Sequence, residues 1–422
     1  QVRFRAPGYE GTAAAVVYPL DDRPTVFRGL AIESSLGDRM VASEARFLPG
    51  SEQIELTDDV RFSNGPTWLE SPAMTVRRDA EDGWIRGVEA GLGVRGETVS
   101  PGRPETSFRA DRVEAEWSGP GVVSRLALLG RAVLTQDGGR ALAASSLTAL
   151  RTDDADGLDG WDVAADGGVV ARAMHEGLPA TLSATTLIGR IDPEGILVRG
   201  DAIGSIRFEH GPSLATADRG TLRRVGPWQE ITLTGLNDAK ARLSQADRRV
   251  AADVLRMRPG TQWLRAEGRA ESTLLPGASG PEPGSAGLFR GDTAIHFVSR
   301  SLETSEGGDG LVFEGSVRGW QGERNLSAQT VRYDQGSSSL TATGDVSTRF
   351  PLREGDALSE SDYVQVTARE LRYREADAVA VYDGDVRVRQ DLGWLECDML
   401  EARMKPDGSG VDMLVGAGGV EL

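Results

Sequence analysis

An internal repeat is the feature of this sequence that most limits its fold. In the clearest copy, Gly344 follows Ala328 by sixteen residues and Val346 follows it by eighteen. Every copy has a small residue at its origin, Gly or Asp at the first of these offsets and Val or Ala at the second. The five copies begin at Ala42, Ala184, Ala252, Ala328 and Ala368. Small-residue anchors recur on average roughly every 35 residues, which is typical of a repeat protein.

Apolar residues inside each copy alternate with polar ones in two short runs. The first run lies three and five residues after the origin, and the second lies twelve and fourteen residues after it. A period of two indicates β-strands. The parity switches between the runs, which predicts a bend, a bulge or a turn there. We therefore expect Gly200, Gly268, Gly344 and Gly384 at strand starts or bends.

Helical signals are weak. The segment from Leu236 to Met257 is rich in helix-forming residues, but it contains two copies of a frame that is strand-like elsewhere, so we predict strands there. A two-strand unit cannot bury an apolar face alone, and stacking such units does so. The predicted fold is all-β: an elongated β-jelly-roll, or β-taco-like repeat array, with an apolar groove.

The candidate groove residues are the apolar residues at the shared offsets, together with the Val pair that follows Gly384. They are Phe47, Ile54, Leu56, Leu187, Ile196, Val198, Leu255, Met257, Leu264, Val331, Leu340, Leu371, Val386 and Val388. Their small and aliphatic character fits two interiors equally well: an open groove for a ligand, or a tight core. The sequence alone leaves both open.

Several function classes are disfavoured by composition. The net charge is −17, with acidic and basic residues interleaved, and no basic stripe is present for nucleic acid. The three histidines, His175, His210 and His296, are far apart. No carboxylate cluster recurs at one frame position. We therefore expect no catalytic residues, no metal and no cofactor, and Cys397 in a small-residue frame position is expected to be a buried structural thiol.

Two stretches resemble known families. The run SAQTVRYDQGSSSLTATGDVSTRF (327–350) and the run from TARELRYREADAVAVYDGDVRVRQ (367–390) to the last residue resemble the OstA/LptA repeat. The N-terminal stretch from Phe27 to Ser71 is similar to the related LptC domain. The sequence between roughly 100 and 300 is more degenerate but keeps the frame.

This resemblance implies three regions: 1–105 (LptC-like), 106–287 (degenerate OstA-like) and 288–422 (OstA/LptA-like), or one continuous array. It implies a periplasmic protein of cell-envelope biogenesis and outer-membrane assembly. Such a protein holds lipopolysaccharide acyl chains between an inner-membrane ABC transporter and an outer-membrane translocon or further bridge proteins. The alternative is a rigid β-solenoid scaffold with a filled core and no lipid cargo.

The two ends of the chain carry further expectations. The sequence begins at Gln1 without Met, which is compatible with a removed signal peptide or inner-membrane anchor. The C-terminal run stays strand-like, and an unpaired strand there would suit pairing with a partner's sheet. The candidate edge residues are Val411, Leu414, Val420 and Leu422.

Overall fold

The computed structural model describes most of the chain. The described residues are 2–6, 9–79, 84–98, 105–119, 122–153, 159–175, 177–192, 197–225, 228–276, 289, 293–351, 363–390, 393–405 and 411–421. They form strands almost throughout, and the only helical element among them is the short 3₁₀ turn η2 (Glu375–Asp377). The all-β prediction is confirmed, including for Leu236–Met257, where the strands are β17, β18 and β19. The described ranges contain no helix of the length and hydropathy needed to cross a membrane.

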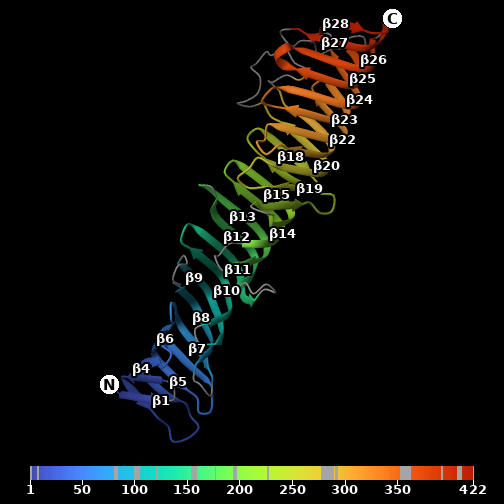
Figure 1. The fold of residues 1–422 in the computed structure, drawn as a ribbon. Helices are drawn as coiled ribbons and strands as arrows, with labels where there is room; N and C mark the ends of the chain where they lie inside the picture. The colour runs from blue at the N-terminus through green and yellow to red at the C-terminus, as the bar shows by residue number, and fades with distance from the viewer. Residues whose placement is uncertain are drawn as a thin grey trace. The chain divides into compact units, whose positions relative to one another are not determined.

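The chain divides into two compact units. Unit 1 comprises residues 1–208 with 221–223, and unit 2 comprises 209–220 with 224–422. The three regions drawn from the sequence stay a prediction. The strands run in chain order through each unit (Figure 1).

The strands of unit 1 are β1 (Val2–Ala6), β2 (Tyr9–Ala13), β3 (Ala15–Val17), β4 (Thr25–Ser34), β5 (Arg39–Phe47), β6 (Gln53–Asn64), β7 (Thr67–Arg78), β8 (Ile85–Thr98), β9 (Thr106–Gly119), β10 (Val122–Gln136), β11 (Arg140–Asp153), β12 (Asp159–His175), β13 (Leu178–Ile191) and most of β14 (Leu197–His210). Unit 2 holds most of β15 (Ser213–Val225) and then β16 (Trp228–Thr234), β17 (Ala241–Ser244), β18 (Arg248–Ala252), β19 (Val254–Met257), β20 (Leu264–Leu274), β21 (Ile295–Thr304), β22 (Gly310–Gln321), β23 (Arg324–Asp334), β24 (Ser339–Pro351), β25 (Tyr363–Arg374), β26 (Val379–Gln390), β27 (Gly393–Met404) and β28 (Val411–Ala417).

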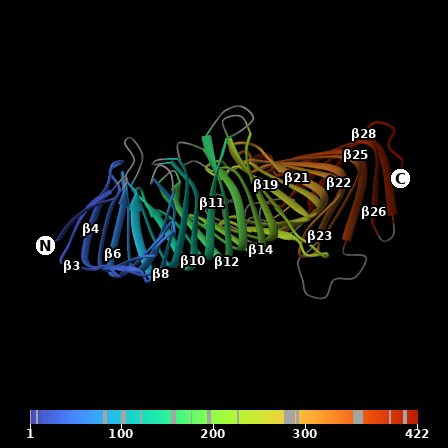
Figure 2. The same ribbon diagram turned by 90° about the horizontal axis from the view of Figure 1, so that it is seen from below.

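Neighbouring strands pair antiparallel, and nearly every pairing shifts register in mid-strand. In unit 1 the shift falls, for example, between Thr57 and Val60 of β6, and in unit 2 between Thr343 and Val346 of β24. At this level alternate strands carry residues with positive φ, such as Asp58 (58°) and Gly344 (79°). Such a bulge bends a strand. Because the bulges line up from strand to strand, they form a corner along each unit, and Figure 2 shows the strands as curved ribs.

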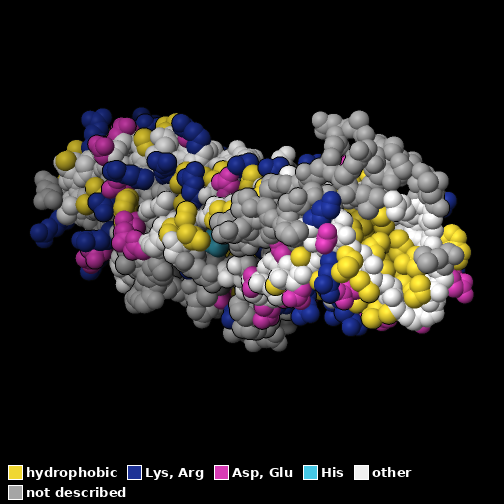
Figure 3. Space-filling view, turned by 90° about the horizontal axis from the view of Figure 1, so that it is seen from above, with side chains coloured by type: hydrophobic (Ala, Val, Ile, Leu, Met, Phe, Trp, Pro, Cys, Tyr) yellow, Lys and Arg dark blue, Asp and Glu magenta, His cyan; other side chains and the backbone are white. Residues whose placement is uncertain are grey.

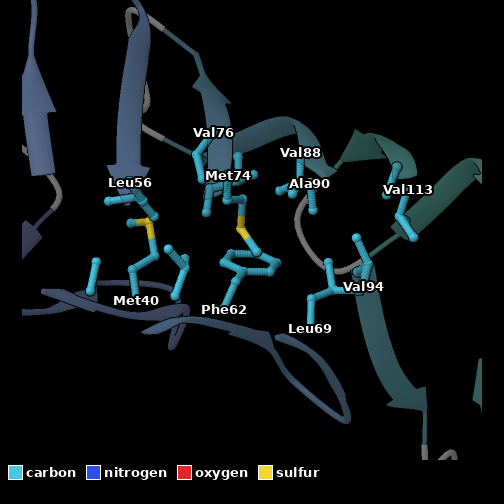
Figure 4. Close-up of a cluster of buried hydrophobic side chains, with 14 of the residues drawn as sticks. Met40, Leu56, Phe62, Leu69, Met74, Val76, Val88, Ala90, Val94 and Val113 are labelled. Carbon is cyan, nitrogen blue, oxygen red and sulfur yellow. The ribbon is translucent and has the colours of Figure 1, made fainter. Parts of the chain in front are cut away.

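The corner divides each strand into two arms that face one another. We call them arm A, which contains Leu56 and Leu371, and arm B, which contains Phe62 and Val386. In Figure 4, Leu56 and Met74 of arm A point toward Met40 and Phe62 of arm B. The interior between the arms holds the apolar core, as the alternation of buried and exposed residues along each strand requires.

The inner face next to the corner is one uninterrupted ladder in each unit. In unit 1 the paired residues of arm A are Phe27, Ala45, Leu56, Met74, Ala90, Val113, Leu128, Leu147, Ala165 and Leu187. In unit 2 they are Leu233, Leu255, Ala266, Leu302, Phe313, Val331, Ala342, Leu371, Tyr382 and Leu400. The residues three and fourteen positions after a repeat origin are therefore cross-strand partners, such as Val331 and Ala342.

The predicted glycine bends are confirmed at three of four positions. Gly268, Gly344 and Gly384 have φ of 75°, 79° and 79°. Gly200 has no positive φ, and the corner of β14 falls four residues later, at Gly204 (φ 80°). The strand segments between Ala184 and this corner, 185–191 of β13 and 197–203 of β14, are longer than the matching segments 329–334 of β23 and 339–343 of β24, so the fixed offset from Ala184 misses the corner.

Replacing a corner glycine tests this architecture. A Cβ added at Gly344 would lie 2.8 Å from Cβ of Gln329, and its φ of 79° is strained for any side chain. We expect Gly344→Ala to destabilise unit 2 by about 1–3 kcal/mol and to lower its urea midpoint. Gly336, in the turn before β24, has no positive φ and only one atom within 4 Å, so Gly336→Ala should leave the midpoint nearly unchanged. Equal midpoints for the two variants would contradict the corner.

Candidate functional site

The interior is closed by aromatic side chains near the N-terminal end of unit 1. The ring of Phe62, on arm B, lies 5.9 Å from that of Trp117, on arm A. Phe4 and Phe47 flank Phe27 at ring distances of 4.7 Å and 5.0 Å. Because these side chains span the gap between the arms, Leu56, Phe62 and their neighbours are almost completely inaccessible.

Unit 2 is closed in the same way from β21 to β27. Phe297, on arm B, stacks on Phe313, on arm A, with ring centroids 4.3 Å apart. Farther along, the hydroxyl groups of Tyr382 (arm A) and Thr348 (arm B) lie 2.7 Å apart in a buried hydrogen bond. Burial raises the pKa of Tyr382, so it stays a neutral phenol. This part of the interior is a packed core.

The interior of β10 to β13 differs from both closed parts. On each arm, the inward-facing residues beyond the one nearest the corner are apolar. They remain partly exposed. We call this surface the inner strip. Its members are Leu126 and Leu134 of β10, Leu142 and Ala149 of β11, Val163 and Ala171 of β12, and Leu182 of β13.

Equivalent positions on neighbouring strands differ in how far their side chains are covered. Leu134, Leu142 and Leu182 occupy the place on arm B that Phe62 and Leu69 fill in β6 and β7, where both are at most 2% exposed. The strands β10 to β13 contain a single Phe, Tyr or Trp, which is Trp161. Without large side chains to span the gap, the apolar inner faces of the two arms are left incompletely covered.

One polar group lies at the border of the inner strip. The side chain of Trp117 is buried, and its indole N–H has no hydrogen-bond partner among the described residues. Trp117 pairs with Val123 of β10. A buried donor without an acceptor is unfavourable by about 1–3 kcal/mol, and an ester or amide carbonyl of a ligand in the strip would satisfy it.

The predicted groove residues fall into three groups. Nearly inaccessible on the inner face are Ile54, Leu56, Leu255, Leu264, Val331, Leu340, Leu371 and Val386, with Met257, Val388 and Leu187 slightly more exposed. Phe47 and Val198 are half-buried, and Val198 shares the inward parity of the buried Ala202. Ile196 lies outside the described residues. The seven inner-strip residues were not among the candidates, because none of the five copies begins on β10, β11 or β12 and Leu182 precedes the origin at Ala184.

The outer face of unit 1 carries paired charges. Arg61 pairs with Glu70 at 3.3 Å, and Arg112 pairs with Glu89 at 3.2 Å, across neighbouring strands. Figure 3 shows basic and acidic side chains interleaved over unit 1. Exposed pairs of this kind contribute little stability. They keep the outside of the strands hydrated, so the apolar surface lies inside.

A buried polar cluster near the free end of arm B serves a turn. The Asp38 carboxylate accepts hydrogen bonds from the Ser34 hydroxyl at 3.0 Å and from the Asn64 amide at 2.5 Å. Burial raises the pKa of Asp38, and burial beside Asp38 raises the pKa of Tyr9 to about 12. These bonds close the link between β4 and β5.

The remaining chemical candidates lie apart from one another. His296 packs on Trp320 with ring centroids 5.3 Å apart and shares a 3.0 Å hydrogen bond with Thr273. His210 is half-buried, and the side chain of His175 lies outside the described residues. Cys397 is buried, and burial raises the pKa of its thiol. Within the described ranges, no group of three or more His, Cys, Asp or Glu could hold a metal ion.

The predicted edge residues lie at the end of unit 2. In β28, Val411 is buried and Leu414 is half-buried, while Val420 beyond it is 49% exposed. Leu422 lies outside the described residues. β28 pairs with β27, and no described strand pairs with its other edge. Figure 3 shows hydrophobic side chains gathered over the C-terminal part of unit 2.

Comparison with known proteins finds likeness to solved structures. No protein-family model matches the chain, and no curated protein matches it. Among solved structures it is similar to LptH from Pseudomonas aeruginosa, described as the LptA homologous periplasmic component of a conserved lipopolysaccharide transport device. The identity is 17%, the match covers 26% of this chain and 73% of that one, and the TM-score is 0.23.

The hydrogen bond between the arms of unit 2 can be measured by a double-mutant cycle. Tyr382→Phe should strand the Thr348 hydroxyl in an apolar interior and lower the free energy of unfolding by about 1–3 kcal/mol. Thr348→Val should have a similar effect. The double variant, which removes both polar groups, should be more stable than the sum of the two losses predicts. Strictly additive losses, read from urea unfolding curves, would show that the two arms are not joined there.

Proposed function

We propose that this chain binds the acyl chains of a lipid between its two arms, without enzymatic activity. The partial exposure of the inner strip is the observation that supports this most directly. A folded protein normally covers inward-facing Leu and Val with its own side chains, as the closed parts of both units do. The inner strip is covered only in part, although four of its residues pack against the core, and incompletely covered apolar surface is a feature of binding sites.

The dimensions and chemistry of the inner strip suit an acyl chain. Four strands at about 4.8 Å each give it a length on the order of 15–20 Å. Leu, Val and Ala offer no hydrogen bonds, so the ligand gains from leaving water, about 0.8 kcal/mol for each buried methylene. Trp117 would orient the ligand by donating its N–H to a carbonyl next to the acyl chain.

The lipid class and the location rest on the sequence resemblance to OstA/LptA and LptC. On that basis we propose lipopolysaccharide or a related acylated lipid as the ligand. We also propose a periplasmic location, with an inner-membrane tether outside this sequence, and a role in transport to the outer membrane. The partners would be an inner-membrane ABC transporter and an outer-membrane translocon or further bridge proteins.

A rigid scaffold is the second candidate function. The packed interior from β21 to β27 favours it, because that part of unit 2 holds its arms together with its own side chains. A scaffold would bind no lipid at all. Mass spectrometry of the purified protein after solvent extraction separates the two functions: a stoichiometric acylated lipid supports the carrier, and none supports the scaffold.

Filling the inner strip should block lipid binding. Ala171→Phe would place a ring between the arms at β12, opposite an acyl chain, and should reduce co-purifying lipid severalfold. Ala141, on β11, pairs with Arg172 on the outer face, so Ala141→Phe is the matched control and should retain lipid. Both variants are compared by circular dichroism and by quantitative lipid extraction. If Ala171→Phe keeps its full lipid content, the ligand does not lie in the inner strip.

Partner contact through the edge of β28 is part of the proposal. The edge of a sheet offers unpaired backbone groups to another strand. Removing residues 411–422 should abolish binding of the downstream partner while the lipid content of unit 1 stays the same. Pull-down with the partner sheet domain measures this, and unchanged binding by the shortened protein would rule out the edge as the contact.

A further inference from the structure

Apolar side chains project into water from the free end of arm A in unit 1. In the link between β3 and β4, Tyr18 is 74% exposed and Leu20 is 99% exposed. Leu48, in the link between β5 and β6, is also exposed. These are the ends of hairpins, where polar turn residues are the usual choice.

The strand register places these links in one row. Val17 pairs with Val26, and Thr25 pairs with Phe47, so the β3–β4 link lies beside the residue that precedes Leu48. We call Tyr18, Leu20 and Leu48 the apolar tips.

The shape of this surface disfavours a protein partner. A stable protein interface needs on the order of 800 Å² of complementary surface on each side. The apolar tips are three side chains on two links, Tyr18 and Leu20 on one and Leu48 on the other, which is too little apolar surface for such an interface. A fluid lipid surface needs no such complementarity, since separate side chains enter it one by one.

The residue types fit the boundary of a bilayer. Tyr and Trp are enriched where a membrane meets water, because one end of each ring is apolar and the other is polar. Aliphatic Leu20 and Leu48 would reach past the headgroups.

The charges near the apolar tips indicate which kind of bilayer surface they suit. Arg23 pairs with Asp21 at 2.8 Å and Arg46 with Glu44 at 2.9 Å. These two basic residues near the tips therefore each have an acidic partner. With no excess of positive charge, attraction to an anionic surface is small, and burial of the apolar tips is left as the driving force.

We infer that the apolar tips of unit 1 dock the protein on the surface of a zwitterionic phospholipid bilayer. This peripheral contact is separate from the inner strip and does not rest on the proposed lipid cargo. It would hold the free ends of arm A against the headgroup region, with the strands standing away from the membrane.

Flotation of the full chain with phosphatidylcholine vesicles tests the inference. The double variant Tyr18→Ser/Leu20→Ser should float with an about tenfold lower partition coefficient, as expected when two large side chains no longer leave water. The matched control is Leu92→Ser/Met174→Ser. Leu92, at the corner, and Met174, on arm B, are 79% and 53% exposed and lie away from the tips. The control should float like the unaltered chain.

Three results would overturn the inference. The unaltered chain could fail to float with the vesicles, or the two double variants could lose flotation equally. In the third result, sedimentation would show the unaltered chain self-associating while Tyr18→Ser/Leu20→Ser stays monomeric, which would assign the tips to a protein contact. Extracted lipid is measured in the same samples. A tip variant that keeps its bound lipid but loses flotation separates this inference from the proposed cargo.

Discussion

The bend in the middle of each strand is the constraint on which the rest of the structure depends. A flat array of antiparallel strands has two faces and nothing to cover the apolar one. Positive-φ residues such as Gly268, Gly344 and Asp58 lie at one level on alternate strands, and the bend that they produce lets one half of a strand cover the other half. The side chain of a neighbouring residue, such as Gln329 over Gly344, takes the space of the missing Cβ. The core, the corner and the two arms all follow from this local geometry.

Side-chain size then decides what the space between the arms becomes. Where Phe62 meets Trp117, or Phe297 stacks on Phe313, rings span the gap and the interior is a core. Where the inner positions are Leu, Ala and Val, as in β10 to β13, the same backbone leaves apolar surface uncovered. A single fold therefore provides both a rigid body and a binding surface, and the aromatic residues set the boundary between them.

Much of this architecture could be predicted from the sequence, because it is encoded locally. The alternation at offsets three, five, twelve and fourteen fixed the inner face, and the parity switch located the bend. The error at Gly200 arose because the frame assumes arms of constant length, whereas the arm A segments of β13 and β14 are longer than those of β23 and β24. Whether the interior is open depends on contacts between the arms, which no repeat offset encodes. A usable signal was present nonetheless: between Trp117 and Phe208 the only Phe, Tyr or Trp is Trp161.

A consequence of joining two arms only at a corner is that their free ends are held by whatever crosses the interior. In unit 2 that role falls to the Phe297–Phe313 stack and to the Tyr382–Thr348 hydrogen bond, which lock the arms at a fixed separation. In β10 to β13 no ring or hydrogen bond of this kind is described between the arms. There Leu126, Leu134, Leu142 and Val163 pack against the buried core while they stay partly exposed. This part of the interior therefore depends on aliphatic packing, which has no preferred direction, whereas the ring stack and the hydrogen bond of unit 2 each require one geometry.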